Sequence, residues 1–515
     1  MKNDTVKPVK RSSLAWSAVV FALCYIVFLL FVFLMIIVNN PSDWRNYFTQ
    51  DFSRFLSLCI CVLILFYIVY YYYYFEDKVF LSDARNVLLI FSIIILSVLT
   101  CYLFGRFVSV FARPTALLAL LCLFLFNRRQ AILLNFVFSL LLFVIDTYTD
   151  NFAANLSTGL TAVPGFLEGG MQTEVYFSLV LGFVCGTFAV LTAGSVKTRG
   201  GLLLLGTFIT IPTVVIILLL ELPAIHELRV NWIAYVASAG YGILGCFLSS
   251  ALTLCFLPVL EFTFNRLTVF RLRELTSANV PLIKRLRTEA PGTFNHSLIV
   301  AQLAETCAIA IGENAELARA AAYYHDIGKL KQPECFSENQ TGYNLHDELT
   351  PELSADIIRS HARDGYELLK TARLPNEIAF VALEHHGTMP MKYFYDKAMR
   401  LSGGDANIAD YSYFGPTPHT KIAAIIMIAD SSEAVARTLK DRSPENVERV
   451  VRAIIEERMD LDQFLDCDIT MRELTIIKTT LVEALSGVHH HRVKYPAIRF
   501  TRQKEAVKED SVDGE

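Results

Sequence analysis

The sequence lacks the cysteine pattern of a disulfide framework or a structural zinc site. None of its 11 cysteines stands in a CxxC pair, so we expect them to act as small apolar residues. Surplus basic charge is also absent, since 46 Lys and Arg residues face 50 Asp and Glu residues and the net charge is −4. Because a surface that binds nucleic acid polymers needs clustered basic charge, this balance argues against such a partner.

Ionisable residues are scarce before Phe262, where long apolar runs alternate with short polar loops. About 20 apolar residues cross a bilayer as a helix, and the runs predict eight spans, at residues 14–38, 54–75, 87–108, 114–127, 130–147, 177–196, 200–221 and 234–260. The fourth is short and could instead form a re-entrant hairpin with the fifth. The spans contain no run of ionisable residues that would mark an ion pathway, which disfavours a transporter. We expect this half to be an anchor or a sensor in the lipid bilayer.

Basic residues are divided unequally between the loops on the two sides of these spans. Positively charged loops tend to stay in the cytoplasm. Ten basic residues fall on the side of the N-terminus, namely Lys2, Lys7, Lys10, Arg11, Lys78, Arg85, Arg128, Arg129, Lys197 and Arg199. Five fall on the other side, namely Arg45, Arg54, Arg106, Arg113 and Arg229. The bias predicts a cytoplasmic N-terminus and, because the number of spans is even, a cytoplasmic second half.

The second half contains all but one of the 11 histidines, and several stand beside aspartates. The candidate metal ligands are His296, His325, Asp326, His361, His385, His386 and Asp430. Five imidazoles and two carboxylates suit iron or manganese, and the absence of thiolates from the set argues against structural zinc. Adjacent residues on a helix point about 100° apart, so such pairs can serve two metals, with the Asp326 carboxylate as a bridge. Two-metal sites of this kind carry out phosphoryl displacement.

The motifs of the second half resemble the HD superfamily of metal-dependent phosphohydrolases. More narrowly, the chain resembles the PgpH-type membrane-anchored cyclic di-AMP phosphodiesterases, the seven-transmembrane HD family. The resemblance covers roughly residues 54–496 by architecture and 270–496 by motif. It is carried by Arg273–Thr276, Asn279–Leu282, Ala290–Thr293, the HDIGK run His325–Lys329, Glu338–Gln340, His385–Thr388 and His491–Pro496.

The resemblance implies a site, an activity and a location. One divalent metal would be held by His296, His325, Asp326 and Asp430, and a second by Asp326, His361, His385 and His386. Cyclic di-AMP would be the cyclic dinucleotide substrate, cleaved to linear pApA at a bacterial inner membrane. Asp326 and Lys329 would be the catalytic residues, with Lys329 meeting a phosphate as a flexible point charge can. His346 is a candidate for substrate contact, for support of the site, or for a plain surface histidine.

Three functional alternatives remain open at this stage. A cyclic di-GMP phosphodiesterase of the sister class would carry a GYP element after its paired histidines, and Gly387–Pro390 does not supply it. A degenerate HD domain would bind a nucleotide as a receptor without cutting it, but degeneracy usually removes a ligand and none is missing. A phosphohydrolase of another nucleotide is the third alternative. The sequence also leaves a homo-oligomer open.

The fold class predicted from these features is all-α, with a multi-span transmembrane bundle followed by a cytoplasmic all-helical HD phosphohydrolase domain. The predicted division has an N-terminal stub with the first span and a short outer loop, a multi-pass domain, a juxtamembrane linker, the HD domain and a tail. These parts are residues 1–53, 54–261, 262–292, 293–497 and 498–515. The tail is charged and lacks apolar periodicity, which is typical of disorder.

Overall fold

The computed structural model describes residues 11–39, 44–45, 49, 52–148, 170–225, 232–340 and 342–486. It divides into two compact units, residues 1–275 and 276–515. Helices make up both units, and the described residues contain no β-strand, their one extended pairing being an isolated bridge between Pro390 and Ser412. The predicted all-α class is therefore confirmed.

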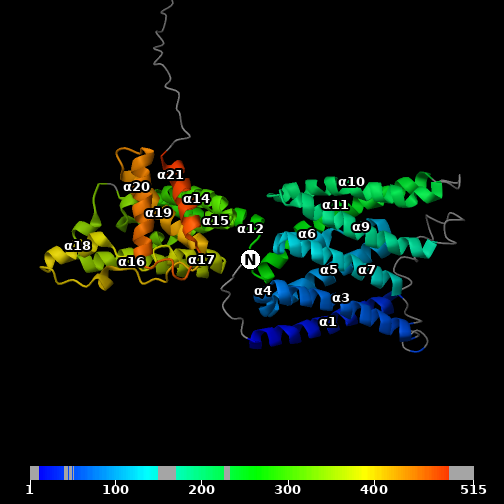
Figure 1. Ribbon diagram of the computed structural model, residues 1–515. Helices are drawn as coiled ribbons and strands as arrows, with labels where there is room; N and C mark the ends of the chain where they lie inside the picture. Colours follow the sequence, from blue (N-terminus) through cyan, green and yellow to red (C-terminus); the bar gives the residue numbers. More distant parts are fainter. Residues whose placement is uncertain are drawn as a thin grey trace, which may run out of the picture. The chain divides into compact units, whose positions relative to one another are not determined.

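Long apolar helices that run side by side build the first unit (Figure 1). Such segments are helical because a helix satisfies its own backbone hydrogen bonds where no water can do so. The elements are α1 (Arg11–Asn39), α3 (Phe52–Glu76), α4 (Lys78–Ser82), α5 (Ala84–Phe107), η1 (Val110–Ala112), α6 (Leu117–Leu125), α7 (Arg128–Tyr148), α9 (Gly170–Ala193), α10 (Arg199–Ile225), α11 (Trp232–Thr263) and α12 (Val269–Leu275).

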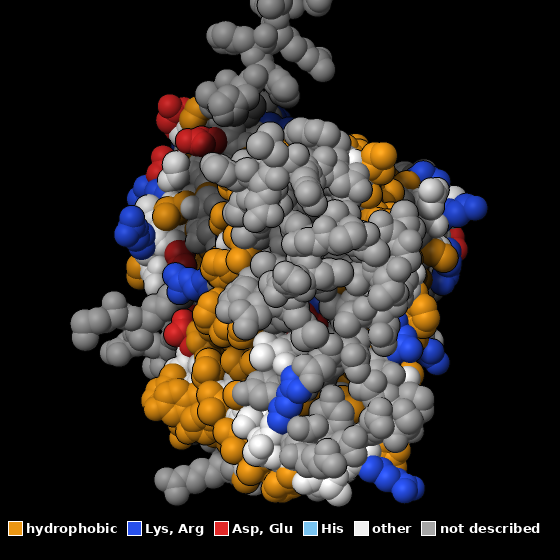
Figure 2. Space-filling view, turned by 90° about the vertical axis from the view of Figure 1, so that its right-hand side faces the viewer, with side chains coloured by type: hydrophobic (Ala, Val, Ile, Leu, Met, Phe, Trp, Pro, Cys, Tyr) orange, Lys and Arg blue, Asp and Glu red, His pale blue; other side chains and the backbone are white. Residues whose placement is uncertain are grey.

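The outer surface of this unit is apolar where α1 and α3 face away from the bundle. Leu23, Leu30, Leu56 and Tyr67 are 46 to 61% exposed, and hydrophobic side chains gather over the lower part of the surface in Figure 2. Large exposed apolar surfaces are rare on proteins surrounded by water. With several helices long enough to span a bilayer, this surface identifies a multi-pass membrane protein.

Among the described residues, seven helices are long and apolar enough to cross a membrane, and six of them belong to the first unit: α1, α3, α5, α7, α10 and α11. The seventh is α14 (Pro291–Ile311) of the second unit. We assign α14 to a globular core because it packs against α15, α19 and α21 and carries the buried His296. Helix α9 is 24 residues long, which is enough to span a bilayer at 1.5 Å per residue.

The predicted span at residues 114–127 is not a full helix. Its helical part, α6, has nine residues and at 1.5 Å per residue covers about 14 Å, roughly half of the hydrocarbon core. The chain before it is a single 3-10 turn, η1, followed by Pro114. Proline cannot continue a helix from the residues before it, so this stretch combines irregular backbone with a half-length helix.

A buried ion pair lies at this break. Arg113 Nη1 donates to Asp146 Oδ2 at 2.6 Å and to Ser178 Oγ at 2.8 Å, and both charged side chains are at most 4% exposed. The loop count above treats Arg113 as an outer-loop residue, and this placement is wrong. Hydropathy places a charged residue between two apolar runs in a loop. It cannot show that irregular backbone carries the side chain into the bundle.

Helices and short 3-10 segments form the second unit. They are α13 (Pro281–Glu289), α14, α15 (Ala315–Tyr324), η2 (Ile327–Lys331), η3 (Pro333–Cys335), η4 (Ser337–Asn339), η5 (Leu345–Asp347), α16 (Pro351–Thr371), α17 (Asn376–Glu384), α18 (Lys392–Leu401), η6 (Ile408–Tyr411), α19 (Lys421–Thr438), α20 (Pro444–Asp460) and α21 (Met471–Leu485). Helix α19 is the most buried, with an unbroken buried run from Ile422 to Asp430.

The predicted five-part division of the chain stays a prediction. The segment assigned to the linker, residues 262–292, contains α12 and α13, and the two compact units meet between Leu275 and Thr276. The predicted tail, residues 498–515, and the motif His491–Pro496 lie outside the described residues.

Candidate metal centre

All seven predicted metal ligands meet inside the second unit. His296 lies on α14, His361 on α16 and Asp430 on α19, while the pairs His325–Asp326 and His385–His386 stand at the ends of α15 and α17. Two sets could each hold a metal ion with ligand atoms within 4.8 Å of one another, and Asp326 belongs to both. The sets are His296, His325 and Asp326, and Asp326, His361, His385 and His386.

Each adjacent pair stands where its helix ends. His325 and His385 are the C-terminal cap residues of their helices and keep right-handed helical backbone angles, so the backbone within each pair stays close to helical. A 3-10 segment, η2, follows Asp326, and Gly387 with φ +52° follows His386. The chain therefore turns at the metal centre directly after each pair.

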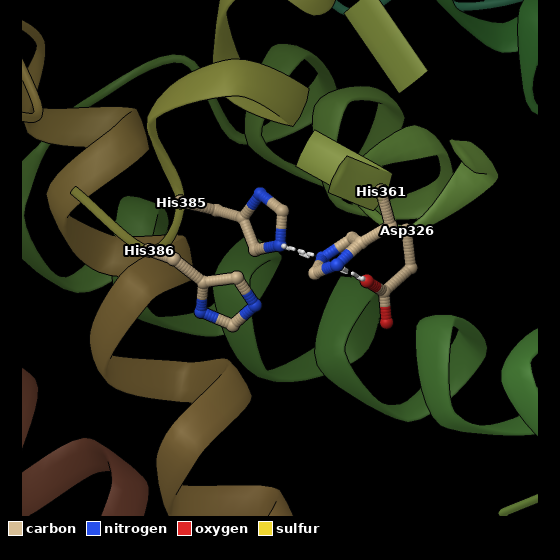
Figure 3. A group of neighbouring side chains, drawn as sticks. All are labelled: Asp326, His361, His385 and His386. Carbon is tan, nitrogen blue, oxygen red and sulfur yellow. Dashed lines mark hydrogen bonds and ion pairs between the residues drawn. The ribbon is translucent and has the colours of Figure 1, made fainter. Parts of the chain in front are cut away.

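The carboxylate of Asp326 lies between the two sets of histidines. Its Oδ1 is 3.3 Å from His361 Nε2 and 3.6 Å from His385 Nε2. Its Oδ2 is 3.3 Å from His325 Nε2 and 3.7 Å from His296 Nε2. Each oxygen thus faces a different set, which is the geometry that a carboxylate needs to bridge two cations. Figure 3 shows one of these sets.

Three imidazoles use Nδ1 in the same way. His325 donates to the carbonyl of Ala322 at 2.7 Å, His385 donates to that of Ala382 at 2.9 Å, and His361 donates to that of Ile358. Since a neutral imidazole carries one proton, these bonds leave Nε2 as an acceptor in each ring.

Lone pairs therefore converge on one buried space. His361 Nε2 and His385 Nε2 are 3.3 Å apart, and His325 Nε2 is buried with no hydrogen-bond partner among the described residues. Buried acceptors without donors are costly. A divalent cation satisfies nitrogen and carboxylate acceptors together, so the residues fit divalent metal binding.

Electrostatics keep two of these rings, His385 and His386, neutral, as metal ligands must be. Burial lowers the pKa of His385 to about 4, and burial together with the neighbouring imidazoles lowers that of His386 well below its ordinary value. His296 differs, because the hydrogen bonds to Asp430 and Glu433 outweigh its burial and raise its pKa to about 10. Metal binding at His296 must displace that proton.

Two side chains beside the cluster are absent from the predicted set. Glu433 Oε2 accepts from His296 Nδ1 at 2.6 Å, and the ring of Tyr413 stacks on that of His386 with centroids 4.3 Å apart. Glu433 could have been found in the sequence, since it stands three residues after Asp430 and such residues share one face of a helix. Tyr413 lies on a loop, and sequence spacing gave no signal for it.

Lys329 lies beside Asp326 with its side chain 13% exposed. Its Nζ lies 2.8 Å from Asp326 Oδ2 and 2.8 Å from Glu338 Oε1, and it stands 5.0 Å from the centre of the Phe336 ring. Burial lowers the pKa of Lys329, but these two carboxylates raise it further, so the net shift is upward. Lys329 is therefore a fixed positive charge at the edge of the metal centre.

His346 lies on the 3-10 helix η5 and is buried. Its Nε2 interacts with the carbonyl oxygen of Cys335 at 2.7 Å, and its ring contacts that of Phe394. The surface-histidine alternative is therefore wrong, whereas the predicted substrate contact stays a prediction.

Two family models match the chain. The model of the HD domain matches residues 293–435, and the model described as a 7TM receptor with intracellular HD hydrolase matches residues 52–268. The first range contains all seven candidate ligands, and the second contains the long helices of the membrane unit from α3 onwards. The chain belongs to the seven-transmembrane HD family.

Curated relatives of this HD protein include the cyclic-di-AMP phosphodiesterases PgpH of Listeria monocytogenes and Bacillus subtilis. The first is 42% identical over 312 residues, which are 60% of this chain and 43% of that protein. The second is 37% identical over 350 residues, which are 67% of this chain and 48% of that protein. The chain thus matches less than half the length of these relatives. The crystal structure of the Listeria PgpH HD domain in complex with cyclic-di-AMP is 47% identical, covering 42% of this chain and all of that one, with a TM-score of 0.40.

Gly328 of the HDIGK motif is required by a close backbone approach. A Cβ atom at this position would lie 2.0 Å from the carbonyl oxygen of His361 and 2.5 Å from the amide nitrogen of Gly365. The missing side chain lets η2 pack directly against α16, which brings His361 next to Asp326.

We predict that Gly328→Ala lowers both thermal stability and metal content. The added methyl group must push η2 away from α16, at a cost of about 1 to 3 kcal/mol, and the separation should disturb the set that contains His361. Thermal unfolding and metal analysis of the purified protein measure the two effects. Gly200→Ala is the control, because nothing lies within 4 Å of a Cβ there. A Gly328→Ala protein that matches this control in both measurements would contradict the packing argument.

Proposed function

We propose that this protein is a membrane-anchored phosphodiesterase that uses two divalent metal ions to hydrolyse cyclic di-AMP to linear pApA. The observation that carries the proposal is the position of Asp326, whose two oxygens face different sets of histidines at 3.3 to 3.7 Å. The nucleotide assignment draws on the activity for which the curated relatives are named and on the missing GYP element after His386.

The seven ligands divide between two ions in this proposal. His296, His325, Asp326 and Asp430 hold one ion, and Asp326, His361, His385 and His386 hold the other. Imidazole and carboxylate donors without thiolates favour iron or manganese. Bound ions of this kind supply an activated water and the positive charge that a phosphodiester displacement requires.

The chain's own residues position the reacting groups. Asp326 fixes the separation of the two ligand sets, because both depend on its carboxylate. Lys329, held between Asp326 and Glu338, places a positive charge where a phosphate oxygen would enter beside Asp326. A charge held in advance stabilises the negative charge that develops on phosphate without reorganisation during the reaction.

The HD domain and the N-terminus are proposed to lie in the cytoplasm of a bacterial cell, with the helices in the inner membrane. Moving Arg113 from an outer loop to the bundle interior strengthens the charge bias, from ten against five to ten against four basic residues. The segment from η1 to α6 is taken to cross the bilayer in broken form, which keeps the number of crossings even.

We predict that reporter fusions after Glu515 and within residues 127–130 both report a cytoplasmic location. Basic loops are retained on that side of the membrane. A third fusion within residues 149–169 should report the opposite side and serves as the internal control. A periplasmic signal from the fusion after Glu515 would reverse the proposed orientation.

We predict that the purified full chain, supplied with manganese in detergent, hydrolyses cyclic di-AMP faster than cyclic di-GMP. Chromatography of the products should show linear pApA. Close to two metal ions per chain should be bound. Metal binding without hydrolysis of either nucleotide would support the receptor alternative, and a higher rate with cyclic di-GMP or another nucleotide would refute the substrate assignment.

We predict that Asp326→Ala abolishes turnover and that Lys329→Ala has a smaller effect. The first change removes a ligand from both ions and therefore lowers metal content as well as rate. The second removes one charge-assisted contact of about 1.5 to 3 kcal/mol and leaves every metal ligand in place. Metal analysis and rates of the two variants, with circular dichroism to confirm the fold, test this order. If Lys329→Ala were the more damaging change, the two-metal mechanism would be wrong.

A further inference from the structure

The histidines of the metal centre are oriented by two kinds of partner. His325, His361 and His385 each donate from Nδ1 to a carbonyl of their own chain three residues earlier. Main-chain acceptors of this kind do not depend on the side chain at the accepting residue. A side-chain substitution at an accepting residue therefore leaves the hydrogen bond to the ring in place.

His296 has a side-chain partner instead. Its Nδ1 lies 2.6 Å from Glu433 Oε2, and its Nε2 lies 2.9 Å from Asp430 Oδ1. Asp430 and Glu433 stand three residues apart on α19, so both face α14 and hold the ring from its two sides. His296 and Glu433 are both buried, at 7% and 4% exposure.

A carboxylate in this position has two effects on a ligand imidazole. It accepts the Nδ1 proton, which leaves Nε2 as the atom that faces Asp326 and Asp430. Its negative charge also makes the ring a stronger electron donor, and such outer carboxylates raise metal affinity in other proteins. A backbone carbonyl provides the first effect fully and the second more weakly, because it carries no net charge.

We propose that Glu433 is a positioning residue that raises metal affinity selectively at the site formed by His296, His325, Asp326 and Asp430. This inference rests on the proposed two-metal function. The ligands His361, His385 and His386 of the other site have no contact with Glu433 among the described interactions. The two sites are therefore expected to respond differently to changes at Glu433.

The test is a manganese titration of the full chain in detergent after removal of metal with a chelator. Two binding events are expected for the unchanged protein. Glu433→Ala should weaken one of them by roughly 10- to 100-fold, the usual loss when such a partner is removed. Glu433→Gln keeps the shape and an acceptor oxygen but not the charge. It should weaken the same event by roughly 3- to 10-fold, since a neutral acceptor bonds about half as strongly.

Electron paramagnetic resonance gives a readout that lost stability alone would not produce. At a manganese concentration that fills both sites of the unchanged protein, the signal of a coupled pair of ions is expected. In Glu433→Ala it should give way to the signal of a single ion in the remaining site. Glu473→Gln is the matched control, because Glu473 binds Lys421 and caps α21 away from the histidines. It should leave both affinities unchanged.

The outcomes separate this inference from the proposed function. No manganese binding by the unchanged protein would refute the proposed function and this inference with it. Two unchanged affinities in both Glu433 variants, or an equal loss at both sites, would refute the role of Glu433 and leave the two-metal proposal intact. If Glu433→Ala did not fold, Glu433→Gln would decide by the same criteria.

Discussion

The second unit depends on one electrostatic requirement, namely that buried acceptors around Asp326 receive positive charge. Ring nitrogens of three histidines and two carboxylates converge there, and burying such groups unsatisfied is costly. Lys329 offsets part of that cost, since its ammonium group lies 2.8 Å from Asp326 Oδ2. The proton on His296, held by Asp430 and Glu433, offsets another part. Divalent cations would replace that proton, so metal affinity should fall as the pH falls.

Helix ends and local hydrogen bonds hold these groups in place. The ligand pairs stand at helix ends, where the backbone turns. The loop after η2 is attached to the start of α14 by Asn339, whose Oδ1 accepts from the amides of Gly292 and Thr293 at 2.9 and 3.1 Å. Glu338, its neighbour, accepts from both Thr293 and Lys329. One short motif thus caps the helix that carries His296 and fixes the lysine beside Asp326.

Residue type and order were enough to predict the fold class and to select seven side chains that meet in one cluster, because histidines and aspartates recur together on apolar segments of the second half. The supporting groups were harder to find. Glu338 entered only as part of a family motif, and Glu433 was overlooked although it stands three residues after Asp430 on the same face of a helix. The geometry shows that both support the site. The turns that follow the two pairs, at η2 and at Gly387, were also missed, since helical spacing does not show where a helix ends. Hydropathy predicted a span at residues 114–127 because it measures the length of an apolar run. It does not show that the helix begins only at Leu117.

The membrane unit also contains buried charges that depend on each other, at the break before α6. A buried Arg113 without Asp146 would be an uncompensated charge, which is strongly unfavourable in hydrocarbon. The irregular backbone at residues 111–113 also needs protein around it. Gly245 of α11 meets that need, because a Cβ there would lie 2.8 Å from the carbonyl oxygen of Arg113. Helices α7, α9 and α11 therefore all contribute to one polar point inside an apolar bundle.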